Sequence, residues 1–237
     1  MKSCTVESNI VKLPGIRLDR NLYLDVKKRL ELIGGKWKGG KVQGFVFPGD
    51  PSGLLSQIAG GQKRDLKKEY QFFETPDRLA DRITGLAEIR EGDAVLEPSA
   101  GRGAIVKAVR RAFPQMQVSG YELMDINRAF LGKLPGFTLL GADFLTECEQ
   151  TFDVIVANPP FSGNRDIEHI RKMYGCLKPG GRLVSVASTH WRFAAGKQEE
   201  TFRKWISGVR AEVHDIARGE FKQSGTMVET CMVIIRK

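Results

Sequence analysis

The stretch Phe152-Asp-Val-Ile-Val-Ala-Asn-Pro-Pro-Phe161 decides how the rest of the chain folds. A short apolar run rich in β-branched residues indicates a strand that is buried on both faces. The strand must end at Pro159-Pro160, because proline lacks the N–H group that would continue a hydrogen-bonded ladder. Such strands belong to parallel sheets covered by helices, and ligands of open α/β sheets bind at the carboxyl ends of the strands.

Three groups project from the end of this strand: the amide of Asn158, the carbonyl of Pro159 and the ring of Phe161. An amide oxygen and a main-chain carbonyl form a pair of acceptors that suits an –NH2 group, and the ring can stack on the planar system that carries the amine. The alternative is an ordinary turn, since Asn-Pro commonly opens one. Features elsewhere in the chain distinguish these two interpretations.

The composition is that of a globular protein of 237 residues with 41% hydrophobic and 27% charged residues. No run of about 18 apolar residues predicts a membrane span, and the first residues lack the apolar core of a signal peptide. The four cysteines are scattered, without C-x-x-C spacing and without clustered histidines. We therefore expect a cytoplasmic protein with reduced thiols, no membrane association and no metal site.

The net charge of +9 is concentrated at the start of the chain. Residues 1–70 hold 14 Lys/Arg against 7 Asp/Glu, a net charge of +7, whereas residues 71–237 hold 23 against 21. This excess indicates a polyanionic partner, although a merely solvated surface is the simpler alternative. We expect residues 1–15 to be a loose lead-in.

The rest of the first 70 residues predicts a small basic helix–hairpin–helix module with a charged linker over 62–70. Apolar residues from Leu18 to Ile33 recur at helical spacing, residues 36–47 form two β-prone stretches around Gly39-Gly40, and Pro51 can open a second helix. Trp37 could stack on a base while its neighbours meet phosphates, or it could join Phe45 and Phe47 in the core of the module. The residues predicted to contact nucleic acid here are Lys36, Trp37, Lys38 and Lys41.

From Phe72 onward strand patterns alternate with helix patterns, which predicts a parallel sheet with helices on both faces. The predicted strands are 94–97, 118–121, 137–140, 153–157, 182–187, 211–216 and 228–235. The predicted helices are 77–86, 103–113, 128–134, 167–176 and 198–207. Residues 71–237 are therefore predicted to form one α/β domain.

The segment Val95-Leu-Glu-Pro-Ser-Ala-Gly-Arg-Gly103 reads as a strand, a carboxylate and a glycine turn that opens a helix. It is not a dinucleotide fingerprint, because Val106 occupies the place of the third small residue. Glu97 would repel a pyrophosphate but attract an ammonium or sulfonium group. Glu122 ends the next strand and can accept both hydroxyls of a ribose, and Asp143 after the third strand can accept from an adenine amine.

These motifs, in this order and spacing, resemble the class I S-adenosylmethionine-dependent methyltransferases. More narrowly, Asn158-Pro-Pro-Phe161 resembles the amino-methyltransferases that act on adenine N6 in DNA, especially the compact enzymes of phages and prophages. The resemblance covers Phe72 to the C-terminus. It implies a Rossmann-like, seven-stranded, mostly parallel sheet whose last strand is antiparallel, with S-adenosylmethionine as cofactor and DNA as partner.

The resemblance also implies roles for individual residues. The cofactor would be held by Phe73, Thr75, Pro76, Glu97, Ser99, Ala100, Gly101, Gly103, Glu122, Asp143, Phe144 and Asn158. Asn158, Pro159, Pro160 and Phe161 would bind a flipped target base. No segment is long enough for a separate target-recognition domain, so we expect low sequence specificity. The target DNA would be recognised by the basic module, by residues 162–166 or by residues 189–197. In the last of these segments, Trp191 and Arg192 are predicted to contact nucleic acid.

Two other interpretations stay open at the level of sequence. Similar motifs occur in enzymes that methylate guanine N2 of ribosomal RNA or glutamine amides of release factors, since each presents a planar –NH2. A non-catalytic DNA-binding protein could keep the same fold, although it would not need the Asn158 motif or the cofactor acids. The sequence does not predict an oligomeric state.

Overall fold

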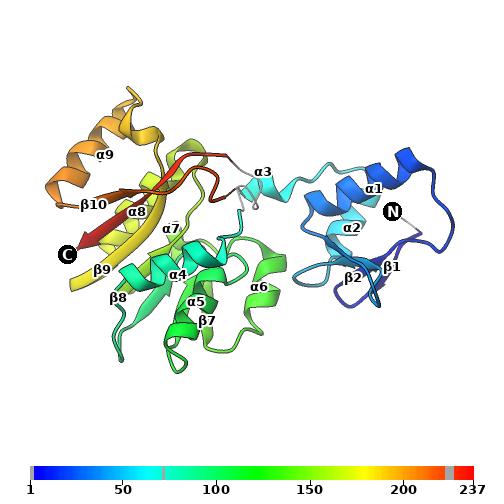
Figure 1. Ribbon diagram of the computed structural model, residues 1–237, viewed down its shortest axis with the longest axis horizontal. Helices are drawn as coiled ribbons and strands as arrows, with labels where there is room; N and C mark the ends of the chain where they lie inside the picture. Colours follow the sequence, from blue (N-terminus) through cyan, green and yellow to red (C-terminus); the bar gives the residue numbers. More distant parts are fainter. Residues whose placement is uncertain (1–2, 71–72, 222–226) are drawn as a thin grey trace. The chain divides into compact units, whose positions relative to one another are not determined.

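The computed structural model describes residues 3–70, 73–221 and 227–237 (Figure 1). The chain divides into two compact units. The first comprises Met1–Phe72 with Met124–Phe130, and the second comprises Phe73–Leu123 with Leu131–Lys237. The predicted boundary between residues 70 and 71 adjoins residues 71–72, which lie outside the described residues. No helix in the described parts of the chain has the length and apolarity that a membrane crossing requires.

The first unit contains a four-stranded antiparallel sheet in the order β1-β2-β4-β3. Its elements are β1 (Thr5–Glu7), β2 (Ile10–Lys12), α1 (Arg20–Leu32), β3 (Lys36–Lys38), β4 (Gly44–Val46), α2 (Ser52–Ala59) and α3 (Leu66–Tyr70). The predicted hairpin is confirmed by the antiparallel pairing of β3 with β4. Helix α1 lies within the predicted helical span from Leu18 to Ile33. It begins at Arg20 because the Asp19 carboxylate accepts hydrogen bonds from the amides of Asn21 and Leu22.

The prediction of a loose lead-in over residues 1–15 is wrong for the described part of that segment. Strands β1 and β2 pair with each other, and β2 continues the sheet onto β4. Asn9 fixes this arrangement, since its side-chain amide donates to the Phe47 carbonyl over 2.6 Å and its own carbonyl accepts from the Phe47 amide over 2.8 Å. These three-residue strands are too short to show a period of two, and no glycine pair marks the turn between them as Gly39-Gly40 marks the turn between β3 and β4.

The core of the first unit is built from Leu30, Ile33, Phe45 and Phe47, all of which are buried. A core role for the two phenylalanines is thus confirmed. The same core includes Met124 and Ile126. Helix α6 (Asp125–Leu131) begins three residues earlier than the predicted start at residue 128, with Asp125 in its first turn.

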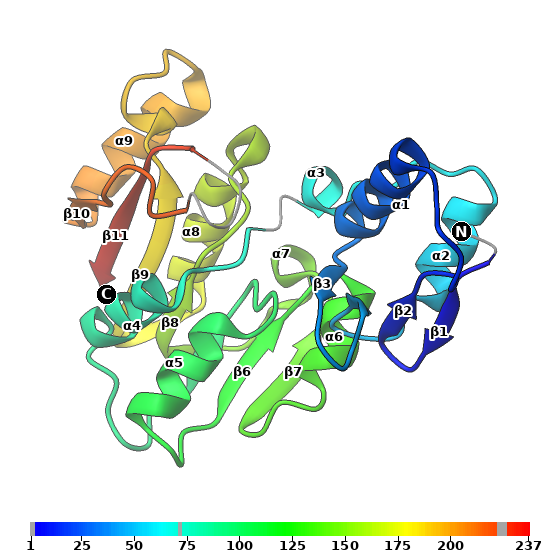
Figure 2. The ribbon, with the colours of Figure 1, turned by 45° about the vertical axis from the view of Figure 1, so that its right-hand side comes forward.

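The second unit contains a seven-stranded sheet in the order β10-β11-β9-β8-β5-β6-β7, and Figure 2 shows β6 and β7 side by side at one edge. The strands are β5 (Val95–Glu97), β6 (Val118–Tyr121), β7 (Phe137–Gly141), β8 (Phe152–Ala157), β9 (Leu177–Ser188), β10 (Glu212–Asp215) and β11 (Thr230–Arg236). All neighbours from β7 to β9 are parallel, whereas β11 is antiparallel to β9 and to β10. The predicted Rossmann-like fold with an antiparallel last strand is confirmed.

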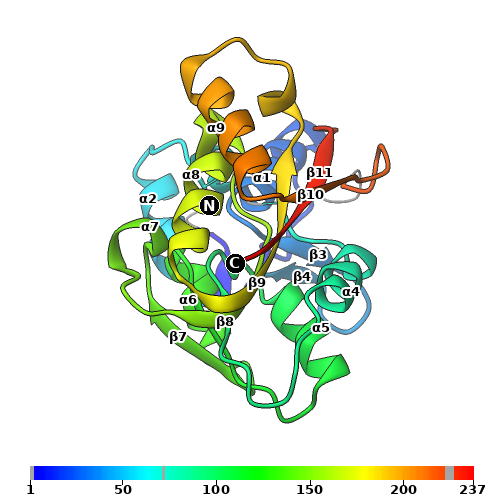
Figure 3. The same cartoon turned by 90° about the vertical axis from the view of Figure 1, so that its left-hand side faces the viewer.

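Helices cover both faces of the sheet (Figure 3), and successive residues of the central strands pack into two different cores. Val154 and Val156 of β8 pack in one core, and Ile155 and Ala157 pack in the other. The first core is covered by α4 (Asp77–Leu86) and α5 (Ala104–Ala112), and the second by α7 (Phe144–Glu147), α8 (Arg165–Gly175) and α9 (Lys197–Gly208). Because both faces are covered, the strands read as continuous apolar runs.

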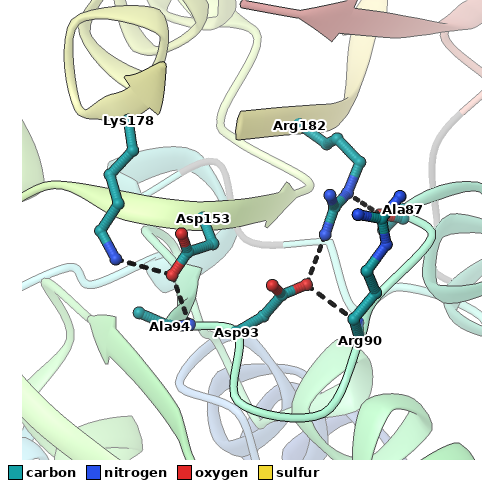
Figure 4. Close-up of polar contacts among 7 residues, drawn as sticks. All are labelled: Ala87, Arg90, Asp93, Ala94, Asp153, Lys178 and Arg182. Atoms are coloured by element: carbon teal, nitrogen blue, oxygen red, sulfur yellow. Dashed lines mark hydrogen bonds and ion pairs between the residues drawn. The ribbon is translucent and has the colours of Figure 1, made fainter. Parts of the chain in front are cut away.

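Ion pairs hold the amino ends of these strands (Figure 4). Asp153 at the start of β8 accepts from Lys178 over 2.7 Å and from the Ala94 amide over 2.9 Å. Buried Arg182 pairs with Asp93 and donates to the Ala87 carbonyl over 3.1 Å. Strand β9 begins at Leu177 rather than at the predicted residue 182, because residues 178–181 bulge out of the ladder while both flanks stay paired with β8.

Candidate active site

Four polar side chains lie at the carboxyl ends of four adjacent parallel strands. Glu97 is the last residue of β5, Glu122 directly follows β6, Asp143 follows β7 and Asn158 directly follows β8. The strand order β8-β5-β6-β7 makes these strands neighbours. The chain leaves β5 toward β6 on one side and returns to β8 on the other. The four residues therefore lie along one edge of the sheet, which includes the topological switch point between β5 and β8, where α/β sheets bind ligands.

The glycine turn after β5 folds back on the end of β6. Gly101 and Gly103 have φ angles of 55° and 69°, in the left-handed region that glycine adopts without a steric penalty. The Ala100 amide donates to the Tyr121 carbonyl over 2.9 Å. A Cβ on Gly120 would lie 2.5 Å from the Glu97 carbonyl oxygen, so the two strand ends approach more closely than a side chain would allow. Ser99 and Ala100 lie in this turn, half-buried and buried respectively.

Glu97 and Glu122 bind main-chain amides on the two sides of this turn. Glu122 accepts from the Gly101 amide over 2.7 Å, and Glu97 accepts from the Val106 amide over 3.2 Å. Burial raises the pKa of Glu97 well above its ordinary value, and the nearby Glu122 carboxylate raises it further. Two buried carboxylates within electrostatic reach of one another form a site that a cationic ligand would stabilise.

Asp143 begins helix α7 rather than projecting freely. Its carboxylate accepts from the Leu145 amide over 3.0 Å, and Glu147 accepts from the Asp143 amide over 2.9 Å. The Phe144 ring is buried and packs between Tyr121 and His169, with centroids 5.8 Å and 5.6 Å away. The ring therefore belongs to the core below the edge of the sheet, and its contact with a cofactor stays a prediction.

The Asn158 amide is held in one orientation. Its nitrogen donates to the Thr75 hydroxyl over 3.0 Å and to the Phe73 carbonyl over 3.4 Å. Because a carbonyl can only accept, the nitrogen must face Phe73 and the oxygen must face away. That oxygen is buried and has no hydrogen-bond partner among the described residues. A buried acceptor without a partner is costly, so this atom is a candidate for contact with a ligand.

The other residues of the motif pack around Asn158. Pro159 is buried, Pro160 is half-buried, and the half-buried Phe161 packs against the core that contains α4. Pro76, which precedes α4, is also half-buried. Phe161 therefore keeps part of its ring accessible.

The structure corrects the prediction for Trp191. This side chain is only 5% exposed and packs edge-to-face on Phe202, with ring centroids 5.1 Å apart, so it is a core residue. Arg192 forms an ion pair with Asp215 over 2.6 Å. The exposed ring of this loop is Phe193, at 81%. The spacing of aromatic residues could not tell which ring faces solvent.

The predicted nucleic-acid contacts of the first unit lie on β3 and the turn after it. Lys36, Trp37, Lys38 and Lys41 are all exposed. Trp37 is 44% exposed and its edge packs on Phe45, with centroids 5.1 Å apart. Strand β3 is an edge strand of its sheet. Among residues 3–70, 73–221 and 227–237, no three His, Cys, Asp or Glu side chains are grouped as a metal ion would require.

Comparison with known proteins identifies the family. Residues 85–205, just over half of the chain, match the family "Methyltransferase small domain". The chain belongs to this family of class I S-adenosylmethionine-dependent methyltransferases. The buried carboxylate pair and the glycine turn fit such a cofactor, whose sulfonium and ammonium groups are cationic.

Individual relatives are distant. The chain is 31% identical over 114 residues to the release factor glutamine methyltransferase of Rhodopirellula baltica, matching 44% of this chain and 38% of that protein. It is 29% identical over 119 residues to modification methylase CviBIII of Paramecium bursaria Chlorella virus NC1A, matching 46% of this chain and 32% of that protein. The chain thus spans less than two fifths of the length of either curated relative.

A similar fold occurs in the methyltransferase subunit of a type I restriction-modification system from Streptococcus thermophilus. Its TM-score is 0.59 at 22% identity, covering 70% of this chain and 45% of that one. A likeness at this level of identity shows the fold alone.

Proposed function

We propose that the protein transfers a methyl group to the exocyclic N6 amine of adenine in DNA. The observation that carries this proposal is the Asn158 oxygen, a buried acceptor without a partner, at the end of a strand next to the buried carboxylates. An acceptor fixed there can bind one hydrogen of an –NH2 group, and the Pro159 carbonyl, next in the chain, can bind the other.

The residues of the chain would act mainly by positioning. The lone pair of the adenine amine is delocalised into the ring, and two acceptors on its hydrogens favour a more tetrahedral, nucleophilic nitrogen. Phe161 would stack on the base once it leaves the duplex. S-adenosylmethionine, when bound, supplies an electrophilic methyl group on a sulfonium. Holding the nitrogen in line with that group can account for a large part of the rate.

The first unit and the Phe193 loop would supply contacts with the nucleic acid. Residues 1–70 carry the basic excess of the chain, and exposed Trp37, Lys38 and Lys41 combine a ring with cations. Such contacts bind phosphates and stack on bases without reading a long sequence. We therefore expect a short or degenerate target site.

A second candidate is methylation of a glutamine side-chain amide. The 31% identity to a release factor glutamine methyltransferase favours it, and a glutamine amide also presents a planar –NH2 to Asn158. The charge of the first 70 residues favours the polyanionic substrate instead.

The test is methyl transfer from labelled S-adenosylmethionine to duplex DNA, ribosomal RNA and a release factor in separate reactions. We expect label in DNA, with N6-methyladenine as the modified nucleoside. Label in the release factor alone would favour the second candidate. Cofactor binding with no transfer to any of the three would indicate a binding protein and overturn the proposal. Mapping of modified adenines to one site of about six base pairs would refute low specificity.

A further inference from the structure

The loop that follows the Asn158 motif is tied to a distant helix. The Asn164 side-chain nitrogen donates to Glu199 over 2.8 Å and to Gln198 over 3.1 Å. Asn164 precedes α8, and both acceptors lie in the first turn of α9. The Asn164 amide is thus used to reach another element rather than to cap its own helix.

This loop needs such support because of its backbone. Gly163 and Asn164 are consecutive residues with φ angles of 62°, in the left-handed region. Asparagine tolerates this region better than other side chains do, but an isolated stretch of two such residues is held only by its surroundings. Loss of the Asn164 contact would therefore allow the loop to adopt other conformations.

Glu199 is placed to provide that contact. Its side chain is 9% exposed and folds over Gly196, where a Cβ would lie 2.1 Å from a carboxylate oxygen. The hydrogen bond from Asn164 holds the pKa of Glu199 below its usual value, so the group is a carboxylate at neutral pH. An ionised acceptor makes the stronger kind of hydrogen bond.

The next turn of α9 holds the neighbouring loop. Arg203 donates to the Trp191 carbonyl over 2.6 Å and to the Ala194 carbonyl over 2.8 Å. Exposed Phe193 lies between these two anchor points. Glu199 and Arg203, four residues apart, lie on one face of the helix. The same helical face therefore holds both the loop after the Asn158 motif and the loop that presents Phe193.

We propose that Glu199 is a positioning residue, which fixes the loop after Phe161 against the 189–196 loop through Asn164. This inference rests on the proposed function in one respect. The loop that Glu199 holds directly follows Asn158 and Phe161, which under the proposed function bind the substrate amine and its base. In this role Glu199 would act through Asn164 and not by contact with substrate or cofactor.

The test exchanges the donor and the acceptor of the bridge. Asn164→Asp places two carboxylates together, whereas Asn164→Asp combined with Glu199→Gln restores a pair in which the glutamine amide donates to the aspartate. We expect the single variant to lower kcat about tenfold, with KM for S-adenosylmethionine unchanged, and the double variant to recover most of this loss. Asn164→Gly keeps the left-handed backbone but lacks the side-chain amide, so its kcat should fall as in Asn164→Asp.

A control variant and a measurement without substrate separate the effect of the bridge from other effects. Glu200→Gln changes the adjacent, exposed acid, which pairs with Lys204 over 2.7 Å, and should leave both loops unaffected. Amide hydrogen exchange over residues 158–165 measures the bridge without any substrate: exchange should rise in Asn164→Asp and fall again in the double variant. A double variant no better than the single one in exchange overturns the inference, whereas a wild type that methylates nothing overturns the proposed function alone.

Discussion

The two halves of the active-site edge are held together in different ways. At the ends of β5, β6 and β7, carboxylates accept main-chain amides of nearby residues, and Glu122 and Gly101 are 21 residues apart. At the end of β8 and in the loop after it, side chains join segments that are remote in sequence. Asn158 reaches Thr75 across 83 residues, and Asn164 reaches Glu199 across 35.

This difference matches the two tasks of the site. A glycine turn braced by its own neighbours can form a preorganised cofactor cradle whatever the acceptor substrate is. Loops held by remote segments can differ between relatives while the fold stays the same, because their anchors lie outside the motif. Under the proposed function, the carboxylate half would bind the cofactor and the other half would select the group that is methylated.

The strongest test of this division is Asn158→Ala. We expect turnover to fall about a thousandfold, because the fixed acceptor for the substrate amine is lost. Binding of S-adenosylmethionine, measured by calorimetry, should change by no more than about twofold, since the carboxylates that favour the cofactor lie in the other half. Asn21→Ala on the exposed surface of the first unit is the matched control. Loss of cofactor binding together with turnover would contradict the division.

His169 tests whether packing joins the two halves, because it lies on α8 and packs on Phe144 of α7. Burial lowers the pKa of His169 from 6.5 to about 4. The unfolded chain therefore binds a proton that the folded protein does not, and stability that is complete above pH 6.5 is lost as the pH falls toward 4. The loss should be on the order of 3 kcal/mol, at about 1.4 kcal/mol per pKa unit.

Urea denaturation between pH 7 and pH 4 measures this loss. His169→Gln should make the free energy of unfolding less dependent on pH over this range. Equal slopes for His169→Gln and the wild type would show that the imidazole is not buried in its neutral form.

Glu97→Gln probes the cofactor half. Because the folded-state pKa of Glu97 lies above the ordinary 4.5, the cofactor-free protein loses stability as the pH rises above that value. The neutral variant should therefore have a higher Tm than the wild type, by a margin that grows as the pH rises above 4.5. It should also bind the cationic cofactor about tenfold more weakly. Exposed Glu91→Gln is the control, and tighter binding by Glu97→Gln would contradict the electrostatic role.

The smallest effect is expected from Thr75→Val, which removes the hydroxyl that accepts from Asn158 but keeps the shape of the side chain. The amide would keep its bond to the Phe73 carbonyl, so kcat should fall only about fivefold. Thr75→Ser should restore the rate, and Thr138→Val on an exposed position of β7 should have no effect. A wild-type rate for Thr75→Val would mean that the Phe73 carbonyl alone orients Asn158.

Sequence periodicity was sufficient for the sheet of the second unit because its central strands are buried on both faces, but it did not predict the four-residue helix α7. Every predicted strand of the sheet is present, and helix α4 has the predicted bounds, residues 77–86. It was insufficient for β1 and β2, which are three residues long, and for α6. The burial of Ile126 in the core of the first unit comes from a contact with remote residues, which no local pattern contains.

The same limit applies to the site. Glu97, Glu122 and Asp143 could be selected because each follows a strand pattern, and strand ends gather at one edge. The Asn164–Glu199 bridge left no local signal, since an asparagine after a motif and a glutamate in the first turn of a helix are each unremarkable alone. Trp191 and Phe193 are two positions apart, and only the packing of Trp191 on Phe202 shows which of them is buried.

The place of Met124 and Ile126 in the first unit has a consequence for biosynthesis. The N-terminal segment leaves the ribosome well before these two side chains are made, yet its core contains them beside Leu30 and Phe47. The early part of the nascent chain must therefore remain incompletely packed until translation has passed Phe130. For the same reason, a fragment cut after residue 70 would expose an apolar surface, so this unit cannot be grafted or removed at a single junction.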